Sequence, residues 1–448
     1  MKLNYQDKNV AVLGFAIEGQ AMTDFLLNRN CHITVYDDKE LDEEVRRKYE
    51  ARGVIFHAGP FGDLTGFDVI SRTPGMRLDR AEIQQASAAG VPVISNTKLF
   101  LDEAKGKVIG ITGTKGKGTT AQLLYNIISS SRDNVFLGGN IGQSPLQFLS
   151  QLNDKSIAIL ELSSFQLADV TKSPQIAIVL MVTSEHLDYH PTSESYIDAK
   201  AGIAKFQQAD DVIIFNSDYP NSVTIAKQSL GRKLAVSRKK LEGEGCFVDN
   251  GWIMMRLGQT EEKIMPVADI ALVGQHNWEN VCPAILAAKL IGIDNKFIID
   301  AIKKFQGLEH RLEFVAEKRG VKYYNDSIST TPESTIAAIK SFSQPKILIL
   351  GGSSKQSDFS LLAQTIKEND VRAIIGVGQE WPRIKEVLWN TTSHLIENLT
   401  TMEEIVEAAR KAAKPGYVVL LSPACASFGL FKDYKDRGRQ FKEAVDKL

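Results

Sequence analysis

A glycine-rich segment that carries two lysines is the part of this sequence whose residue types most directly suggest chemistry. It reads GTKGKGT over residues 113–119 and separates an apolar run from an amphipathic stretch. Glycines let backbone N–H groups close around phosphate oxygens, and the N-terminus of a helix favours the anion. We therefore expect an ATP-binding loop in which a lysine neutralises the β- and γ-phosphates. The loop residues are Gly113, Thr114, Lys115, Gly116, Lys117, Gly118 and Thr119, and Lys117 is the phosphate-neutralising lysine.

Candidate magnesium ligands accompany this loop. Gly118 stands where serine or threonine usually follows the lysine, so we assign the magnesium-binding hydroxyl to Thr119, with Thr120 as the alternative. The apolar run 157–162 delivers Glu161 to the carboxyl edge of the expected sheet, where such sheets bind ligands. A carboxylate there can hold the magnesium that bridges ATP phosphates, whereas Glu161 alone would fit a helix-capping acid equally well.

A second polar cluster follows the next apolar run. Residues 183–190 read TSEHLDYH, and Lys200 follows in a helix-like stretch. A histidine and several acids at the end of a strand could hold a second metal ion, and spacing alone does not choose between His186 and His190. A solvated turn with an incidental histidine is the competing interpretation.

Two asparagines open a later helix rich in alanine and leucine. Asn277 and Asn280 lie one helical turn apart, so their amides share a face and could contact the edge of an adenine ring. Helix capping is the alternative, and it explains one asparagine better than two.

The elements that must position these residues alternate in a regular way. Short apolar runs and amphipathic stretches follow one another, which indicates parallel α/β sheets. Residues 233–271 differ, because short alternating runs and glycine turns there predict a small antiparallel insert. The expected strands are 9–14, 32–36, 68–71, 91–95, 107–112, 157–162, 176–182, 211–216, 322–325, 346–350, 373–377 and 417–421, and the expected helices include one after Thr119, 402–413 and 431–447.

The first strand-to-helix turn resembles a nucleotide-binding turn. It runs from Gly14 to Gly19 in a GxGxxG pattern with Ala16 at the central glycine, and Asp37 follows the second strand. An acidic residue about 20 positions on suits a nucleotide ribose or base. Taken alone, this pattern also fits an NAD-dependent dehydrogenase.

Composition excludes several classes of protein. The 448 residues are too many for one compact core, and 43% hydrophobic with 24% charged residues is ordinary for a soluble globular protein. A formal net charge of −1 gives no electrostatic reason to expect nucleic-acid binding. No run is long enough to span a membrane and the start lacks a signal-peptide pattern, so we expect a cytoplasmic location. The four cysteines are far apart and are expected to be buried, reduced thiols.

Taken in order, these motifs resemble the Mur ligase family, which shares its core with folylpolyglutamate synthetase. The motifs are the loop at 113–119, the segment ELSSFQL at 161–167, His186, Lys200, the segment at 274–280 and His310-Arg311. GGNIG at 138–142 and SPACAS at 422–427 are most similar to the D-glutamate-adding branch of that family. The resemblance covers essentially the whole chain. It implies three domains: a Rossmann-like UDP-binding domain at 1–98, a P-loop ATPase-type domain at 99–307 and a Rossmann-like amino-acid-binding domain at 308–448.

The resemblance also implies a reaction. ATP would phosphorylate the L-alanine carboxylate of UDP-N-acetylmuramoyl-L-alanine, and the amine of D-glutamate would attack the acyl phosphate to give an amide, ADP and phosphate. Because an anionic carboxylate must approach an anionic phosphate, cations must screen both. We expect two Mg²⁺ ions and a monomer that contacts neither nucleic acid nor membrane.

Each implied role falls on particular residues. Lys117, Glu161, His186 and Lys200 would form the catalytic centre, with Thr119 and Glu161 on the first magnesium and His186 with a carbamylated Lys200 on the second. Asn277, Asn280, Arg311 and Asp326 would complete the ATP site. Ala16, Ile17, Asp37, Asp38 and the turn Thr73, Pro74 and Gly75 would hold UDP, while Asn140, Ser163 and Gln166 would face the muramoyl group. Thr330, Lys355, Ser427, Phe428 and Tyr434 would line the D-glutamate pocket.

Some positions depart from the family pattern. Ile328 stands where the family often has lysine, so Lys355 is the candidate to supply that charge, and Tyr434 stands where phenylalanine is common. The alternatives to a D-glutamate ligase are a family member that adds L-alanine or a diamino acid, an NAD-dependent dehydrogenase, and a non-catalytic binding subunit. The dehydrogenase interpretation leaves the second glycine loop and Glu161 unexplained.

Overall fold

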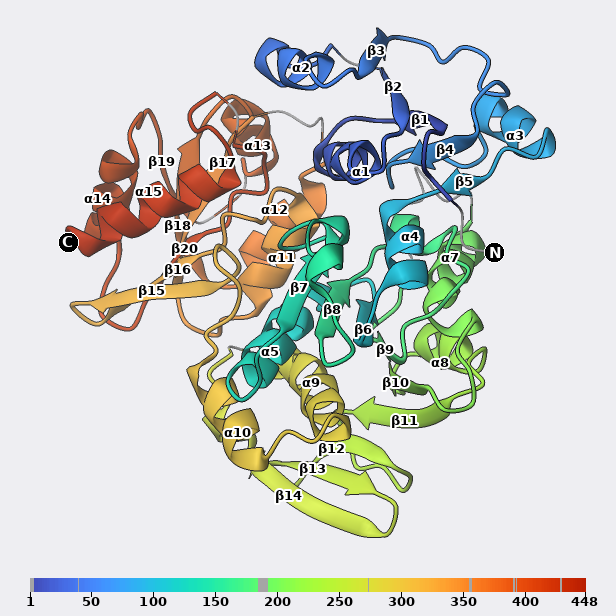
Figure 1. The fold of residues 1–448 in the computed structure, drawn as a ribbon. Helices are drawn as coiled ribbons and strands as arrows, with labels where there is room; N and C mark the ends of the chain where they lie inside the picture. Colours follow the sequence, from blue (N-terminus) through green and yellow to red (C-terminus); the bar gives the residue numbers. More distant parts are fainter. Residues whose placement is uncertain are drawn as a thin grey trace. The chain divides into compact units, whose positions relative to one another are not determined.

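The structure is a computed structural model that describes residues 4–38, 40–183, 192–272, 274–353, 357–389, 391, 393–427 and 429–448. The chain divides into two compact units, and each is described by itself. The first comprises residues 1–270 and 276–303, and the second comprises residues 271–275 and 304–448. The predicted three-part α/β fold is confirmed, because the chain forms a five-stranded, a nine-stranded and a six-stranded sheet (Figure 1).

The five-stranded sheet at the start of the chain is wholly parallel, in the order β3-β2-β1-β4-β5. Parallel strands place their carboxyl ends at one edge, which brings the first turn and the end of β2 together. The elements are β1 (Asn9–Leu13), α1 (Ile17–Leu27), β2 (His32–Asp37), α2 (Glu43–Glu50), β3 (Ile55–Ala58), β4 (Val69–Arg72), α3 (Ala81–Ala88), β5 (Val93–Ile94) and α4 (Asn96–Glu103).

The nine-stranded sheet also belongs to the first unit and has the order β14-β13-β12-β11-β10-β9-β6-β8-β7. Its strands are β6 (Lys107–Thr112), β7 (Val135–Gly139), β8 (Ile157–Glu161), β9 (Ile176–Val179), β10 (Val212–Asn216), β11 (Arg232–Ser237), β12 (Gly245–Asp249), β13 (Trp252–Leu257) and β14 (Thr260–Pro266). The helices between them are α5 (Lys117–Ser129), η1 (Pro145–Gln147), η2 (Leu149–Gln151), α6 (Ser164–Leu167), α7 (Ser193–Lys205), α8 (Pro220–Ala226), η3 (Val267–Asp269), η4 (Gln275–Asn277), α9 (Trp278–Leu290) and α10 (Asn295–Lys304).

The predicted antiparallel strands between residues 233 and 271 extend this sheet. β12, β13 and β14 pair antiparallel with one another, as expected from their glycine turns. β12 also pairs in parallel with β11, and β11 pairs in parallel with β10, so the insert is continuous with the ATP-loop sheet.

The six-stranded sheet forms the second unit, in the order β15-β16-β20-β17-β18-β19. Only β15 is antiparallel to its neighbour. Alternate residues of β17 pack into different apolar clusters, Leu348 into one and Ile347 into the other, as expected for a strand covered on both faces. The elements are β15 (Glu313–Lys318), β16 (Val321–Asn325), α11 (Pro332–Lys340), β17 (Lys346–Gly351), α12 (Ser360–Glu368), β18 (Val371–Val377), α13 (Trp381–Val387), β19 (His394–Ile396), α14 (Met402–Ala412), β20 (Val418–Leu421) and α15 (Tyr434–Asp446).

Two expectations from composition can be compared with the structure. Cys31, Cys246, Cys282 and Cys425 are buried thiols rather than disulfides, as predicted. Within the described parts of the chain, no helix is both long and apolar enough to cross a membrane.

Candidate active site

The glycine loop joins β6 to α5, and its backbone suits an anion. Gly116 is the N-cap of α5 with a φ of +89°, and no described side chain caps the first turn of that helix. The N–H groups at such a helix end are available to an anionic ligand. A Cβ at residue 116 would lie 2.1 Å from Oδ1 of Asn280, so a side chain here would have to displace the Asn280 amide, and the left-handed φ also favours glycine. A loop with this backbone can accept an anion such as phosphate.

Lys117 and Glu161 meet at this loop. Lys117 is the first residue of α5, and its ammonium lies 3.8 Å from Oε1 of Glu161 at the end of β8. The lysine Nζ also donates to the backbone oxygen of Thr114 at 3.3 Å. Glu161 is almost completely buried, so its charge requires a cation close by. Lysine and glutamate thus stand beside each other where phosphate and magnesium were predicted.

Lys200 of α7 lies beneath the same loop. Its side chain is buried, and its Nζ donates to the backbone oxygen of Gly113 at 3.0 Å and to Oγ1 of Thr112 at 3.4 Å. The ammonium also lies 4.7 Å from the ring centre of Tyr196, whose hydroxyl is 3.1 Å from Oγ1 of Thr114. The lysine therefore supports the loop directly. The second-metal partner predicted for it, His186, lies outside the described residues.

Asn277 and Asn280 share a face, as their spacing predicted. Nδ2 of Asn280 donates to Oδ1 of Asn277 at 2.8 Å, and Oγ1 of Thr120 donates to Oδ1 of Asn280 at 3.4 Å. Both asparagines are buried at the start of α9, which packs against α5. The pair therefore lies against the ATP loop itself.

The donor set around the loop fits magnesium bound together with nucleotide. In the described part of the chain, no group of three or more His, Cys, Asp or Glu side chains could hold a metal ion alone. Magnesium often binds through one or two carboxylates together with substrate phosphates. Glu161 with the Thr119 hydroxyl, both buried beside the loop, supplies the protein share of such a site.

The turn that was predicted to hold UDP is built from two closely approaching segments. The Asp37 carboxylate accepts the Phe15 N–H at 2.7 Å, and both the N–H and the hydroxyl of Thr73 donate to the backbone oxygen of Leu13 at 3.0 Å. A Cβ on Gly19 would lie 2.0 Å from the backbone oxygen of Gly14, so glycine is needed for this packing. Ala16 and Ile17 are exposed at the start of α1, and Asp38 pairs with Arg80 at 3.4 Å.

The residues predicted to face the muramoyl group differ in exposure. Asn140 is exposed, and its N–H donates to the backbone oxygen of Glu161 at 2.9 Å. Gln166 is buried in α6, where its Oε1 accepts from the N–H and the hydroxyl of Ser163 at 3.0 and 3.1 Å. Its Nε2 donates to Oε1 of Glu18 at 2.7 Å. The amide of Gln166 is thus held at both ends by the protein.

Glu18 was not among the predicted site residues. Burial raises the pKa of its carboxyl from 4.5 to about 7, against the lowering effects of the Gln166 hydrogen bond and the Arg72 charge. Its Oε2 is buried and has no hydrogen-bond partner among the described residues. The GxGxxG pattern draws attention to the glycines and not to the acid between them, which explains the omission.

In the second unit, Asp326 lies at the end of β16. It is buried, and its carboxylate accepts from the Leu312 N–H at 3.1 Å and from the Ser422 hydroxyl at 2.7 Å. Burial raises the pKa of Asp326 from 3.8 to about 6. Arg311, which was also predicted for the ATP site, is exposed, and its positive charge acts to lower the pKa of Asp326.

Three of the five residues predicted for D-glutamate fall within the described part of the second unit. Thr330 is half-buried, Ser427 is buried and Tyr434 begins α15, whereas Lys355 and Phe428 lie outside the described residues. The backbone oxygen of Tyr434 accepts a hydrogen bond from the Ser327 hydroxyl at 2.8 Å. The Tyr434 ring packs edge-on against the His310 ring, with 6.0 Å between the ring centres.

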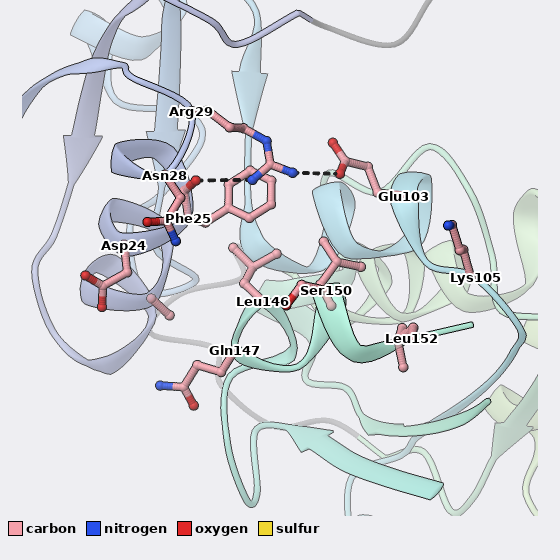
Figure 2. A pocket seen from close by; sticks show the side chains of 12 residues that line it. Asp24, Phe25, Asn28, Arg29, Glu103, Lys105, Leu146, Gln147, Ser150 and Leu152 are labelled. Carbon is pink, nitrogen blue, oxygen red and sulfur yellow. Dashed lines mark hydrogen bonds and ion pairs between the residues drawn. The ribbon is translucent and has the colours of Figure 1, made fainter. Parts of the chain in front are cut away.

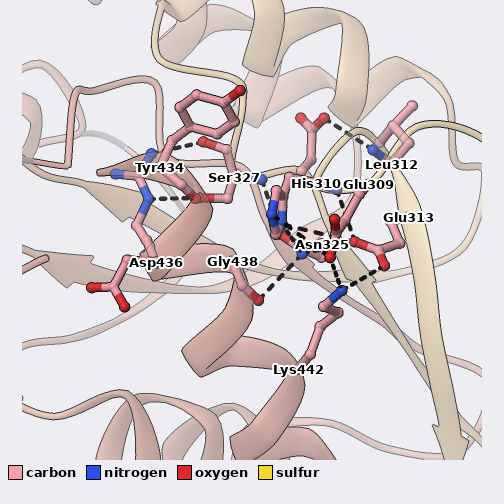
Figure 3. Close-up of polar contacts among 12 residues, drawn as sticks. Glu309, His310, Leu312, Glu313, Asn325, Ser327, Tyr434, Asp436, Gly438 and Lys442 are labelled. Atoms are coloured by element: carbon pink, nitrogen blue, oxygen red, sulfur yellow. Dashed lines mark hydrogen bonds and ion pairs between the residues drawn. The ribbon is translucent and has the colours of Figure 1, made fainter. Parts of the chain in front are cut away.

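A polar network around Asn325 fixes α15 against β15 and β16 (Figure 3). Nδ2 of Asn325 lies 2.9 Å from Nδ1 of His310 and donates to Glu313 at 3.0 Å and to the backbone oxygen of Gly438 at 3.3 Å. Lys442 donates to the other oxygen of Glu313 at 3.1 Å. Burial lowers the pKa of His310, which favours the neutral ring. This network sets the position of Tyr434 at the N-terminus of the helix.

A cavity of about 480 Å³ lies elsewhere in the first unit, between α1, the C-terminal end of α4, and the 3₁₀ turns η1 and η2. Figure 2 shows Arg29 reaching across it from the end of α1 to Glu103, with the ion pair at 3.3 Å. The lining residues include Leu146 and Leu152 but none of the predicted site residues. The cavity is therefore separate from the predicted chemistry.

Comparison with known proteins agrees with this arrangement. Descriptions of a Mur ligase MurD-like N-terminal domain, a Mur ligase middle domain and a Mur ligase glutamate ligase domain match residues 8–95, 111–288 and 310–425. The UDP-N-acetylmuramoylalanine--D-glutamate ligase of Acetivibrio thermocellus is 36% identical over 458 residues, covering 100% of this chain and 98% of the relative. The chain belongs to the Mur ligase family. The enzyme of the same name from Koribacter versatilis is also 36% identical, covering 100% of this chain and 99% of the relative.

Solved Mur ligase structures share the fold. The UDP-N-acetylmuramate-alanine ligase of Thermotoga maritima superposes with a TM-score of 0.58 at 16% identity, covering 98% of this chain and 99% of that one. The MurF ligase of the same organism, solved in complex with ADP, gives 0.56 at 18% identity, covering 99% and 96%. Family membership removes the dehydrogenase interpretation of the first glycine turn.

Proposed function

We propose that this Mur ligase joins D-glutamate to UDP-N-acetylmuramoyl-L-alanine in the synthesis of peptidoglycan precursors. It is an ATP-dependent ligase that forms a carbon–nitrogen bond and releases ADP and phosphate. Identity of 36% to D-glutamate ligases over the full length supports the substrate choice. The observation that carries the chemistry is the contact of Lys117 with Glu161 beside a glycine loop that Asn280 fixes.

The reaction divides into two balanced steps. A carboxylate oxygen of the L-alanine attacks the γ-phosphorus of ATP, forming an acyl phosphate while ADP leaves. The amine of D-glutamate then attacks the acyl carbon, loses a proton, and phosphate departs as the amide forms. Both steps bring anions together, so positioned positive charge supplies most of the acceleration.

The residues of the chain divide this work. Lys117 and the loop N–H groups bind the phosphates, and Asn277 and Asn280 hold the adenine side of the nucleotide. Mg²⁺ supplies charge neutralisation when bound, and Glu161 and the Thr119 hydroxyl would hold it. We propose that Lys200, as its carbamate, and His186 would hold a second Mg²⁺.

The substrate-binding roles follow the three sheets. Residues 1–98 bind UDP through Ala16, Ile17, Asp37, Asp38 and the turn at 73–75, and residues 99–307 bind ATP and the muramoyl group through Asn140, Ser163 and Gln166. Residues 308–448 bind D-glutamate through Thr330, Lys355, Ser427, Phe428 and Tyr434, with Arg311 and Asp326 on the nucleotide. The enzyme acts as a cytoplasmic monomer.

Amino-acid-dependent release of ADP tests this function. With ATP, Mg²⁺ and UDP-N-acetylmuramoyl-L-alanine present, D-glutamate should support ADP release, whereas L-alanine and lysine should not. Lys117→Met should lower kcat/KM on the order of a hundredfold or more, because one positioned charge is lost at the developing anion. Lys155→Met, an exposed lysine on a distant turn, is the matched control. Turnover with another amino acid alone would show that the substrate assignment is wrong.

Carbamylation of Lys200 has a readout of its own. Protein incubated with ¹³C-bicarbonate should show a carbamate ¹³C signal that disappears in Lys200→Ala. The same signal in the variant would assign the carbamate to another lysine.

A further inference from the structure

A buried arginine at the end of an apolar strand connects the first sheet to the segment around α6. Arg72 is the last residue of β4 and is 0% exposed. A buried charge is stable only when it is paired and hydrogen-bonded. Both Asp169 oxygens accept from it, at 3.0 Å from Nε and 2.9 Å from Nη2.

The remaining donors of Arg72 bond to backbone oxygens. Nη2 donates to Phe165 at 2.9 Å, while Nη1 donates to Pro74 at 3.3 Å and to Met76 at 3.2 Å. Together with the two bonds to Asp169, these contacts engage all five N–H groups of the guanidinium. Arg72 therefore has neither an exposed surface nor a spare donor with which to touch a ligand.

These partners lie on two different parts of the substrate site. Pro74 lies in the turn at 73–75, which the proposed function assigns to UDP, and Met76 follows that turn directly. Phe165 lies in α6 between Ser163 and Gln166, which it assigns to the muramoyl group. Asp169 follows α6 and also accepts the Ser95 hydroxyl at 3.0 Å. The Arg72 side chain thus connects the turn assigned to the UDP end of the substrate with α6, which is assigned to the muramoyl end.

We infer that Arg72 is a positioning residue for the nucleotide-sugar substrate, setting the spacing between the UDP turn and α6. This role rests on the proposed function, since it requires that both segments contact the same substrate. It extends that function, because Arg72 and Asp169 themselves lie outside the residues assigned to substrate contact. The described hydrogen bonds of Arg72 go to the turn after β4, to α6 and to Asp169, and none of them goes to the glycine loop, so ATP binding should not depend on it.

Three variants separate positioning from simple stabilisation. Arg72→Met alone leaves the Asp169 carboxylate buried without its partner, so stability should fall. Arg72→Met with Asp169→Leu removes both charges, and such replacements commonly restore stability. The double variant still lacks the bonds to the three backbone oxygens. Arg72→Lys keeps the charge facing Asp169 but cannot reproduce the planar fork of donors.

Steady-state kinetics and thermal unfolding of the full chain give the test. The double variant should unfold near the wild-type temperature, yet its KM for UDP-N-acetylmuramoyl-L-alanine should rise roughly tenfold because the two segments are misplaced. Its kcat and its KM for ATP should stay within about twofold of wild type, and Arg72→Lys should show the same selective rise in KM. Arg29→Met, which breaks the half-buried Arg29–Glu103 pair of the same unit, is the control and should change neither KM.

Other results would contradict the inference or the function on which it rests. If KM for the nucleotide sugar is at the wild-type value in the stable double variant or in Arg72→Lys, Arg72 is only structural and the inference is wrong. An equal rise in the KM for ATP would also overturn it. A wild-type protein that releases no ADP with this substrate and D-glutamate would instead overturn the proposed function, and with it the inference.

Discussion

Replacing Glu18 by glutamine should change how the stability of the protein depends on pH. Burial raises the pKa of Glu18 from 4.5 to about 7 in the folded chain, so between these values the folded state binds more protons than the unfolded state. Stability linked to this group is therefore complete below about pH 4.5 and is lost as pH rises through about 7. The carboxylate form is the costly one, because Oε2 has no hydrogen-bond partner among the described residues.

The size of the effect follows from the two pKa values. A shift of one unit corresponds to about 1.4 kcal/mol, so the wild-type protein should lose about 2 kcal/mol of unfolding free energy between pH 5 and pH 8 through Glu18. Glutamine cannot ionise, and its amide oxygen can still accept from Nε2 of Gln166. Glu18→Gln should therefore be close to wild type in stability at pH 5 and more stable than wild type at pH 8.

Urea denaturation followed by circular dichroism at pH 5, 6, 7 and 8 measures this difference. Other groups titrate in both proteins, so the difference between wild type and variant isolates Glu18. Glu50→Gln, an exposed residue of α2 paired with Arg46, is the control and should follow the wild-type curve. If the gap between Glu18→Gln and wild type stays within about 0.5 kcal/mol over this range, the carboxyl is not buried as described and the reasoning fails.

Three further changes test other parts of the structure. Gly116→Ala should destabilise the protein by about 2 kcal/mol, because residue 116 has a left-handed backbone and the new Cβ would meet Asn280. In urea denaturation, the double variant Gly116→Ala with Asn280→Ala should lose less stability than the two single variants lose in sum. Additive losses would show that the two residues do not touch. Burial raises the pKa of Asp326 to about 6, so the wild-type protein should lose about 2 kcal/mol of unfolding free energy as pH rises from 4 to 7. Asp326→Asn should make stability depend less on pH over this range, and an unchanged slope in thermal unfolding would contradict this. Lys200→Ala should lower turnover on the order of a hundredfold while circular dichroism stays unchanged, and near-normal ADP release would exclude a catalytic role.

Most strands inside the sheets could be predicted from the sequence, whereas four of the six edge strands could not, and the edge strand β5 was expected at 91–95. The strand Lys107–Thr112 was expected with the bounds it has, because a continuous apolar run ends at a glycine turn. β3, β7, β15 and β19 were all missed, and each lies at the edge of its sheet. An edge strand is half-solvated and can carry polar residues, as at both ends of Glu313–Lys318. Its hydrophobic pattern in the sequence is therefore weak.

The local motifs of the site were also predictable, but their long-range contacts were not. The spacing of Asn277 and Asn280 predicted a shared face, and their hydrogen bond confirms it. Nothing in the spacing indicated that Asn280 would touch Gly116, or that Arg72 would pair with Asp169, because these contacts join distant segments. An arginine in a sequence usually indicates a solvated surface. Arg72 can be buried because five oxygen atoms accept its five N–H groups, and only the structure shows these acceptors.

The loop at residues 113–119 is held at several points by contacts with other parts of the chain. Thr114 bonds to the backbone of Thr183, Gly113 accepts from Lys200, and Gly116 fits against Asn280. A receptor that is already in its bound shape loses little conformational freedom when the ligand arrives, so more of the phosphate contacts count as affinity. Nucleotide association should then proceed as docking onto a preorganised cradle, with a small entropic penalty from the loop itself.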